Sequence, residues 1–366
     1  MLYYTAGDAI VTKEEFYEKI HGGELSELSP VRGVPKLSRS ITFSTGKLTP
    51  ENAIPFQPIG IGKPLTIMIR QIYTGKYPDS FFGSNKDMLA TSAVKSITSS
   101  EEKPRALNFL MEKVSTNNVI EHPPAVSQGT PFVFYSPALV ENSLTLDLSI
   151  VFDNFPQQLF TIVGNAFQTA AGIPIFLPYS TYILGLSGIA KLAGSIGEAI
   201  FDGKPAFSTS DGLDFFLPGA IPVPSGFALV TDRNVDTIDP MFREKYQVDK
   251  SGQVVDESGK KYRGEIPFIV ISFDGTAQKE LESFAPTAAT AAILSRFYGM
   301  KDGQQQNLDT LINAIKVYND LKYRTQVDTL DKEIENCKDG AEKMEELKKK
   351  RDALAKNIIT DLLKKT

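Results

Sequence analysis

Residues 144–152 read LTLDLSIVF, and the alternation in this stretch decides the fold we expect. One face of the extended chain carries only large apolar residues: Leu144, Leu146, Leu148 and Ile150. The other face carries Thr145, Asp147 and Ser149. This pattern is typical of an antiparallel strand with one buried face. Residues 65–73, LTIMIRQIY, alternate in a similar way and are rich in isoleucine, which also favours a strand.

Further strands are predicted on both sides of these two, at residues 88–97, 131–135, 226–231 and 266–273. Irregular loops separate the strands, whereas a doubly wound sheet would place regular helices between them. Residues 105–114 are the exception, since Pro104 stands at the expected first position of a short helix. The sequence therefore predicts an α+β protein built on an antiparallel β-sandwich over 65–285.

Two loop regions are also predicted within the sandwich. Residues 249–264 contain two Ser-Gly turns and are expected to form a small exposed hairpin. Residues 207–219, FSTSDGLDFFLPG, are expected to form a turn-rich loop that carries Asp211 and Asp214.

The segment before the sandwich, residues 1–64, is predicted to hold one helix and an extended arm. Residues 12–20 are expected to be helical, with Thr12 and Glu15 at the spacing of a capping box. Residues 22–64 are rich in glycine, proline and serine, which excludes a helix. We expect this arm to wrap the main domain or to remain mobile.

No charged side chain occurs from Asn154 to Ala190. Helices are predicted at 156–172 and 178–201, separated near Pro174 and Pro178, so an apolar helical hairpin is inserted at 156–201. We expect such a segment to be covered by its own sheet, by a partner chain or by lipid. Contact with lipid would occur at the membrane surface or after a trigger. Constitutive membrane spanning is disfavoured because two prolines interrupt the segment and no Lys/Arg cluster flanks it.

The C-terminal region, residues 286–366, is predicted to be helical, with helices at 286–299 and 308–324. The tail at 326–366 is highly charged, and its apolar residues follow coiled-coil-like spacing: Val327, Leu330, Ile334, Cys337, Ala341 and Met344. Asp339 and Gly340 interrupt that spacing, so a turn between two antiparallel helices is the alternative. A solvated helix packed on its own domain is a further alternative to partner binding.

Composition excludes several function classes. The net charge of −5 argues against nucleic-acid binding. The chain has a single cysteine, Cys337, which excludes an internal disulfide and is consistent with the reducing environment of the cytoplasm. The N-terminus has no basic segment of the kind that begins a signal peptide. Only His21 and His122 are present, about 100 residues apart by their numbering, so a histidine metal site or catalytic triad is not expected. We expect the chain to have no enzymatic activity and to bind no cofactor.

Residues 65–155 resemble a C2 domain, an eight-stranded antiparallel sandwich with aspartates in the loops at one end. The resemblance rests on a strand, a loop with Asp79 and Asp87, a second strand and a later strand that ends at Asp153. In calcium-binding members such aspartates coordinate the ion, so the resemblance implies Asp79, Asp87 and Asp153 as metal ligands. The family's Asp-Pro-Tyr in the second strand is absent, and the FPQQ that follows Asp153 adds no carboxylate. Ordinary surface aspartates are the alternative.

Two functions remain open. The first is a non-enzymatic binding or adaptor protein that contacts protein partners through 326–366 and through the insert at 156–201. The second is a membrane-acting effector, pore-forming or lipid-binding, which stores the insert against the sandwich until a trigger releases it. The expected location is the cytoplasm, with a membrane surface as a further site of action.

Overall fold

The structure is a computed structural model of the 366-residue chain. It describes residues 1–21, 56–78, 85–96, 105–121, 128–169, 175–176, 205–215, 221–281, 308–337 and 341–364.

The larger of two sheets has nine strands within this described part of the chain. Its order is β13-β12-β2-β1-β11-β14-β3-β6, and β7 also pairs with β3. The bounds are β1 Leu2–Ala6, β2 Ala9–Val11, β3 Leu65–Tyr73, β6 Val119–Ile120, β7 Phe132–Ser136, β11 Gly226–Thr231, β12 Tyr246–Val248, β13 Val254–Asp256 and β14 Phe268–Asp274. Every pairing in it is antiparallel.

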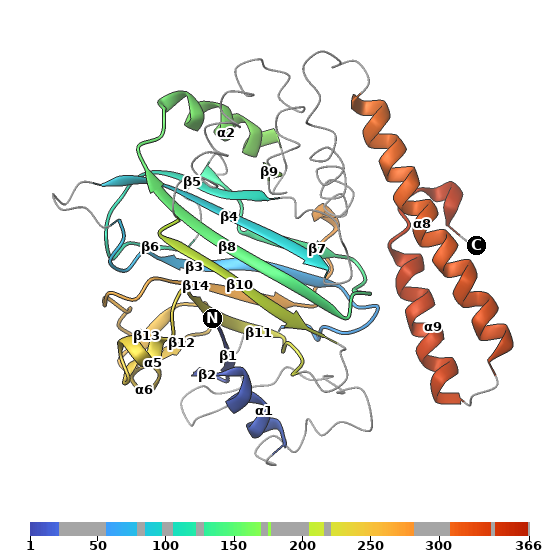
Figure 1. The fold of residues 1–366 in the computed structure, drawn as a ribbon, viewed down its shortest axis with the longest axis horizontal. Helices are drawn as coiled ribbons and strands as arrows, with labels where there is room; N and C mark the ends of the chain where they lie inside the picture. The colour runs from blue at the N-terminus through green and yellow to red at the C-terminus, as the bar shows by residue number, and fades with distance from the viewer. Residues whose placement is uncertain are drawn as a thin grey trace.

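The smaller sheet has five strands in the order β10-β8-β4-β5-β9, again all antiparallel. The bounds are β4 Lys86–Ser96, β5 Ala106–Val114, β8 Ser143–Asp153, β9 Ile175–Phe176 and β10 Phe207–Asp214. Figure 1 shows this sheet lying across the larger one.

The main core lies between the two sheets. The apolar face predicted for 144–152 is buried there together with side chains of β3, β11 and β14, such as Ile67, Ala228 and Ile271. Alternation in β8 therefore identified the buried face correctly, because each inward side chain meets the opposite sheet. The architecture is an α+β sandwich with antiparallel sheets.

Both outer faces of the sandwich are covered in part. Helix α2, Gln157–Thr169, lies on the small sheet through Leu159, Val163 and Phe167. On the large sheet, helices α5 (Val235–Ile238) and α6 (Phe242–Lys245) cover an aromatic cluster that includes Tyr73, Phe268 and Tyr262. The single-turn helix η4, Lys279–Leu281, follows β14.

The N-terminus belongs to the large sheet, although the sequence placed the sandwich at 65–285. Strand β1 pairs with β11, and β2 extends the sheet beyond it. Helix α1, Lys13–His21, follows, and its predicted capping box is confirmed. The Glu15 N–H donates to Thr12 Oγ1 at 3.1 Å, and the Thr12 N–H donates to the Glu15 carboxylate at 2.8 Å.

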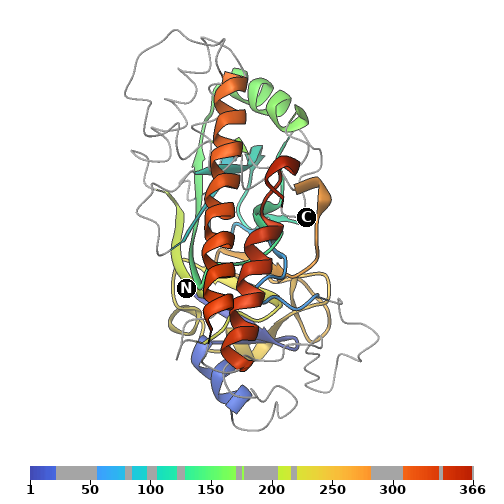
Figure 2. The ribbon, with the colours of Figure 1, turned by 90° about the vertical axis from the view of Figure 1, so that its right-hand side faces the viewer.

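Two long helices lie at one end of the sandwich. Helix α8 spans Leu308–Asn336 and helix α9 spans Ala341–Lys356; the single-turn helix η6, Asp361–Leu363, follows. Figure 2 shows the two helices running side by side, and Val327 and Leu330 of α8 pack with Leu354 of α9. Two residues of the predicted apolar spacing, Val327 and Leu330, thus make a contact within the chain.

Two segments differ from their sequence-based prediction. Residues 105–114, expected to be a helix, form β5, which pairs with β4 and β9. Residues 207–214, expected to be a loop, form β10. The small hairpin has its strands at β12 and β13, and Val248 and Val254 are buried, so it is less exposed than expected.

Other predictions lie outside the described residues. They concern the helix at 178–201, the helix at 286–299, and the arm over residues 22–55.

Candidate functional site

Two of the three predicted metal ligands lie together at one end of the small sheet. Asp87 of β4 stands opposite Asp153 of β8 in the antiparallel register. Asp79 lies outside the described residues. The sequence predicted Asp153 at the end of a strand and Asp87 in a loop, whereas Asp87 lies within β4, and the pairing of β4 with β8 brings the two residues together.

Both carboxylate oxygens of Asp87 accept backbone hydrogen bonds. One accepts the N–H of Lys113 at 3.0 Å, and the other accepts the N–H of Phe155 at 3.0 Å. Lys113 has a φ of 54°, which residues other than glycine rarely adopt. Asp87 thus ties a strained residue of β5 to the segment that leads into α2.

A hard cation needs several oxygen ligands at once. One oxygen of Asp153 accepts the N–H of the adjacent Asn154 at 2.8 Å. Within the described ranges no group of three His, Cys, Asp or Glu side chains is placed to hold a metal ion. The geometry here assigns Asp87 to positioning α2, and the metal-site prediction depends on Asp79.

Helix α2 has two contrasting faces. Leu159, Val163 and Phe167, spaced by four residues, pack onto apolar side chains of the small sheet: Leu89, Leu107, Leu110 and Val151. Among the helix side chains that the structure describes, the exposed ones are polar but uncharged: Gln157, Gln158, Thr161, Asn165 and Gln168. Gln157 donates to the Glu112 carboxylate of β5 at 3.0 Å. The uncharged stretch therefore begins as a helix whose apolar side is covered by the sheet.

Helix α9 meets the sandwich at a glycine. Gly62 has a φ of +71°, and a Cβ placed there would lie 3.2 Å from the Cβ of Ala353. Asn357 Nδ2 donates to the carbonyl of Ala138 at 3.0 Å and to that of Ala353 at 3.1 Å. A close backbone approach and one buried amide therefore join the helices to the loops at 60–63 and 137–142.

Asp320 of α8 fixes the chain that follows α9. Its carboxylate is buried and accepts the N–H of Ile359 at 3.2 Å and the N–H of Thr360 at 2.7 Å. It also accepts the Thr360 hydroxyl. These bonds supply the hydrogen-bond partners that a buried polar side chain needs.

Glu141 and Tyr323 lie where α8 approaches the sandwich. Burial raises the pKa of Glu141, although the N–H of Val140, which donates to its carboxylate at 3.3 Å, opposes the change. Burial, together with the negative charges of Glu141 and Asp320, raises the pKa of Tyr323 to about 12. Tyr323 is therefore neutral at physiological pH, and Glu141 favours its protonated form more than an exposed glutamate does.

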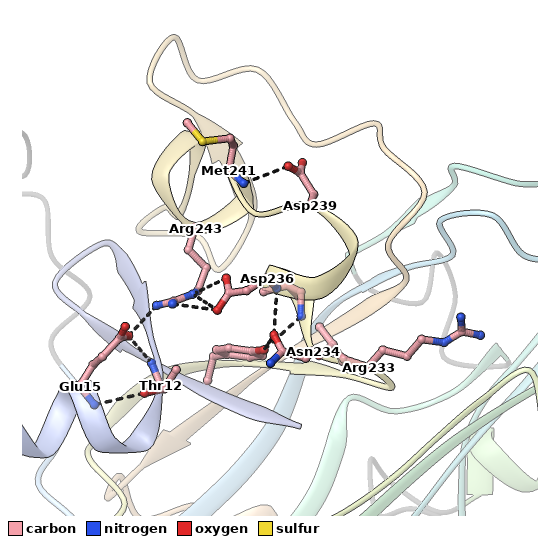
Figure 3. Close-up of polar contacts among 11 residues, drawn as sticks. Thr12, Glu15, Arg233, Asn234, Asp236, Asp239, Met241 and Arg243 are labelled. Carbon is pink, nitrogen blue, oxygen red and sulfur yellow. Dashed lines mark hydrogen bonds and ion pairs between the residues drawn. The ribbon is translucent and has the colours of Figure 1, made fainter.

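Arg243 joins helices α1, α5 and α6 (Figure 3). From α6 it donates to both oxygens of Asp236, with the shortest contacts at 2.8 Å, and to the Glu15 carboxylate of α1 at 2.5 Å. Hydrogen bonds, led by that to Asp236, raise the pKa of Arg243. Partial burial of Glu15 tends to raise its pKa, but the hydrogen bond from Arg243 opposes this, and the pKa of Glu15 is lowered. This cluster locks α1 against α5 and α6.

Sequence reasoning missed the residues that make these joints, namely Arg243, Asp320 and Asn357. Each contacts a residue far away in the chain, so no local spacing reveals it. What the joints have in common is mechanical, since they hold helices in fixed positions on a sandwich.

The described helices include none that is both long enough and apolar enough to cross a membrane.

Comparisons with known proteins show little. No family profile matches the sequence. No curated protein matches it either. Among solved structures, a C2 domain of plant extended synaptotagmin 1 is similar, with 9% identity and a TM-score of 0.22. The match covers 60% of this chain and 99% of that domain.

Proposed function

We propose that this chain is a non-enzymatic binding protein, an adaptor, in which the sandwich presents helical surfaces to a protein partner. The proposal places it in the cytoplasm, as its single cysteine and its composition favour, without nucleic acid or cofactor.

The observation that carries the proposal is an exposed apolar pair on α8. Val317 and Leu321 are 41% and 46% exposed and lie four residues apart, which places them on one face of the helix. Figure 1 shows the first part of α8 extending beyond the end of α9. An i, i+4 apolar pair is the spacing by which helices bind grooves or other helices.

The seam at 326–366 has a different role in this proposal. Val327, Leu330 and Leu354 pack against one another within the chain, so this seam supports the presenting helix. The partner contact predicted for the tail therefore moves to the N-terminal part of α8.

The test uses cells that contain the full-length protein in tagged form. Val317→Asp with Leu321→Asp should abolish the recovery of bound protein partners, because two charges would enter the contact. Thr325→Asp with Thr329→Asp, at exposed positions of the same helix, is the matched control and should retain them. Equal recovery with both variants would contradict the proposal.

The membrane-acting effector is the second candidate, and the exposed face of α2 favours it. That face carries no charge, and none occurs from Asn154 to Ala190. The purified chain should then co-sediment with liposomes and release an entrapped dye, and deletion of 156–201 should remove both effects. If the intact chain shows neither effect at every pH tested from about 5 to 8, this candidate is contradicted.

A further inference from the structure

Strand β10 forms one edge of the small sheet. It pairs with β8 on one side, and no other strand in the described part of the chain pairs with it. Its sequence, FSTSDGLD, contains no proline or lysine, and its two charged residues, Asp211 and Asp214, lie after the Ser-Thr-Ser of 208–210. The edge is therefore a template on which another strand can form hydrogen bonds.

Two contacts show which residues direct their backbone groups away from β8. Lys13 Nζ donates to the carbonyl of Gly212 at 2.7 Å, and the N–H of Val223 donates to the carbonyl of Asp214 at 2.8 Å. Alternate residues of an antiparallel strand direct both backbone groups to the same side. Ser208 and Ser210 share the parity of Gly212 and Asp214. Their N–H and C=O groups therefore point to the open edge, where no described residue bonds them.

The side chains around these groups are small and polar. Ser208 and Ser210 are exposed on the outer face of the sheet, where Ser210 donates to Asp147 at 2.6 Å. Thr209, between them, points into the sandwich, and its buried hydroxyl has no partner among the described residues. No bulky or charged side chain at 208–210 obstructs an approaching strand.

We propose that two copies of this chain join through β10, antiparallel about a two-fold axis at Thr209. Residues 208–210 read Ser-Thr-Ser, the same in both directions, so Ser208 of one copy pairs with Ser210 of the other. Each such pair exchanges two backbone hydrogen bonds. Two pairs satisfy all four open groups of each copy, and the two small sheets become one continuous sheet.

This self-complementarity is what selects a second copy as the occupant. The axis places the two Thr209 side chains opposite each other, an arrangement in which threonine hydroxyls hydrogen-bond across strands. Asp211 falls opposite Phe207, so no like charges meet. The Lys13 contact with Gly212 lies just beyond the paired residues and is retained.

Sedimentation velocity over a range of concentrations tests the pairing. The wild-type chain should show a monomer–dimer equilibrium. Ser210→Pro removes an N–H that does not face β8, so the sandwich should fold while one hydrogen bond per copy is lost. The dimer dissociation constant should rise about tenfold or more. Ser210→Ala keeps the N–H and should dimerise like wild type. A monomeric wild type, or an unchanged constant for Ser210→Pro, would overturn the proposal.

A charge-swap pair tests the register and does not depend on proline. Ser208→Lys with Ser210→Lys, and Ser208→Glu with Ser210→Glu, change only exposed side chains. Each variant alone should be monomeric, because like charges would face each other, and an equimolar mixture should form the heterodimer. A mixture that remains monomeric while both variants show the wild-type melting temperature would refute the antiparallel pairing. Val317→Asp with Leu321→Asp should leave dimerisation unchanged, so this proposal and the partner surface on α8 fail separately.

Discussion

Helix α2 and the α8–α9 pair are attached to the same sandwich by opposite means. Helix α2 buries a stripe of Leu159, Val163 and Phe167 and has an uncharged exposed face. The α8–α9 pair has a highly charged surface and meets the sandwich through Gly62 and Asn357. Apolar burial holds α2 on the sheet, whereas a close backbone approach, a few polar bonds and the apolar contact of Val140 hold the helical pair on the sandwich.

The largest effect is expected where apolar burial holds the helix. Phe167→Ala removes a fully buried ring between α2 and the small sheet, so the free energy of unfolding should fall by about 3–5 kcal/mol. Chemical denaturation measures the change. Gln168→Ala, at the exposed neighbouring position, is the control and should stay within about 0.5 kcal/mol of wild type. A loss below about 1 kcal/mol for Phe167→Ala would mean that the sheet does not depend on α2.

The attachment of α9 should break without loss of the sandwich. Gly62→Ala places a methyl group 3.2 Å from the Cβ of Ala353, in a backbone conformation that costs about 1–2 kcal/mol for L-residues. Gly259→Ala is the matched control, since Gly259 has a φ of +81° and no atom lies within 4 Å of the added Cβ. Hydrogen exchange should show faster exchange at 349–357 only for Gly62→Ala. Equal exchange at 349–357 in both variants would show that the contact at Gly62 does not hold α9 in place.

The sequence predicted elements whose pattern is local. Alternation identified β3 and the inward face of β8, and Thr12 with Glu15 identified the start of α1. Residues 105–114 were misinterpreted because Leu, Met, Glu and Lys favour a helix, whereas pairing of Leu110 with Leu89 on β4 stabilises a strand. Strand β10 was missed because its glycine and aspartates are typical of turns.

Only the part of the site that depends on the positions of residues along strands could be predicted from the sequence. Asp87 and Asp153 end up opposite each other because they occupy equivalent ends of adjacent strands. That Asp87 accepts the N–H of Phe155 could not be predicted, because the bond depends on the path of the chain after β8.

Asp87 offers a smaller perturbation that affects α2 alone. Asp87→Asn keeps the shape but removes the charge from two hydrogen bonds and leaves one carbonyl oxygen as the only acceptor. Stability should fall by about 1–1.5 kcal/mol, with faster exchange at the first turn of α2. Asp153→Asn, on the opposite strand, is the control and should have a smaller effect because its described bond is to the adjacent Asn154. If both variants lose the same stability, Asp87 does not specifically hold α2.

The smallest effect concerns pH and the attachment of α8. Burial raises the pKa of Glu141, so the folded chain binds a proton at this site more tightly than the unfolded chain does. The stabilising protonated form is fully present below the unfolded pKa of about 4.3. As pH rises from there to the folded pKa, the folded state loses stability relative to the unfolded state. Tyr323 and Asp320 face this site from α8. Burial raises the pKa of Tyr323 to about 12, so Tyr323 stays neutral while Glu141 ionises, and the Asp320 side chain accepts three hydrogen bonds.

Glu141→Gln should therefore remove the pH dependence of hydrogen exchange that arises where α8 is attached to the sandwich. Glutamine keeps a neutral side chain of the same length, so exchange at residues 320–327 should lose its dependence on pH over the range from the unfolded to the folded pKa of Glu141, after correction for intrinsic exchange. In the wild-type chain that corrected exchange should rise with pH over the same range. Asp361→Asn, at a fully exposed carboxylate near the C-terminus, controls for general charge effects. A wild-type profile that is already flat would show that Glu141 ionises without disturbing α8.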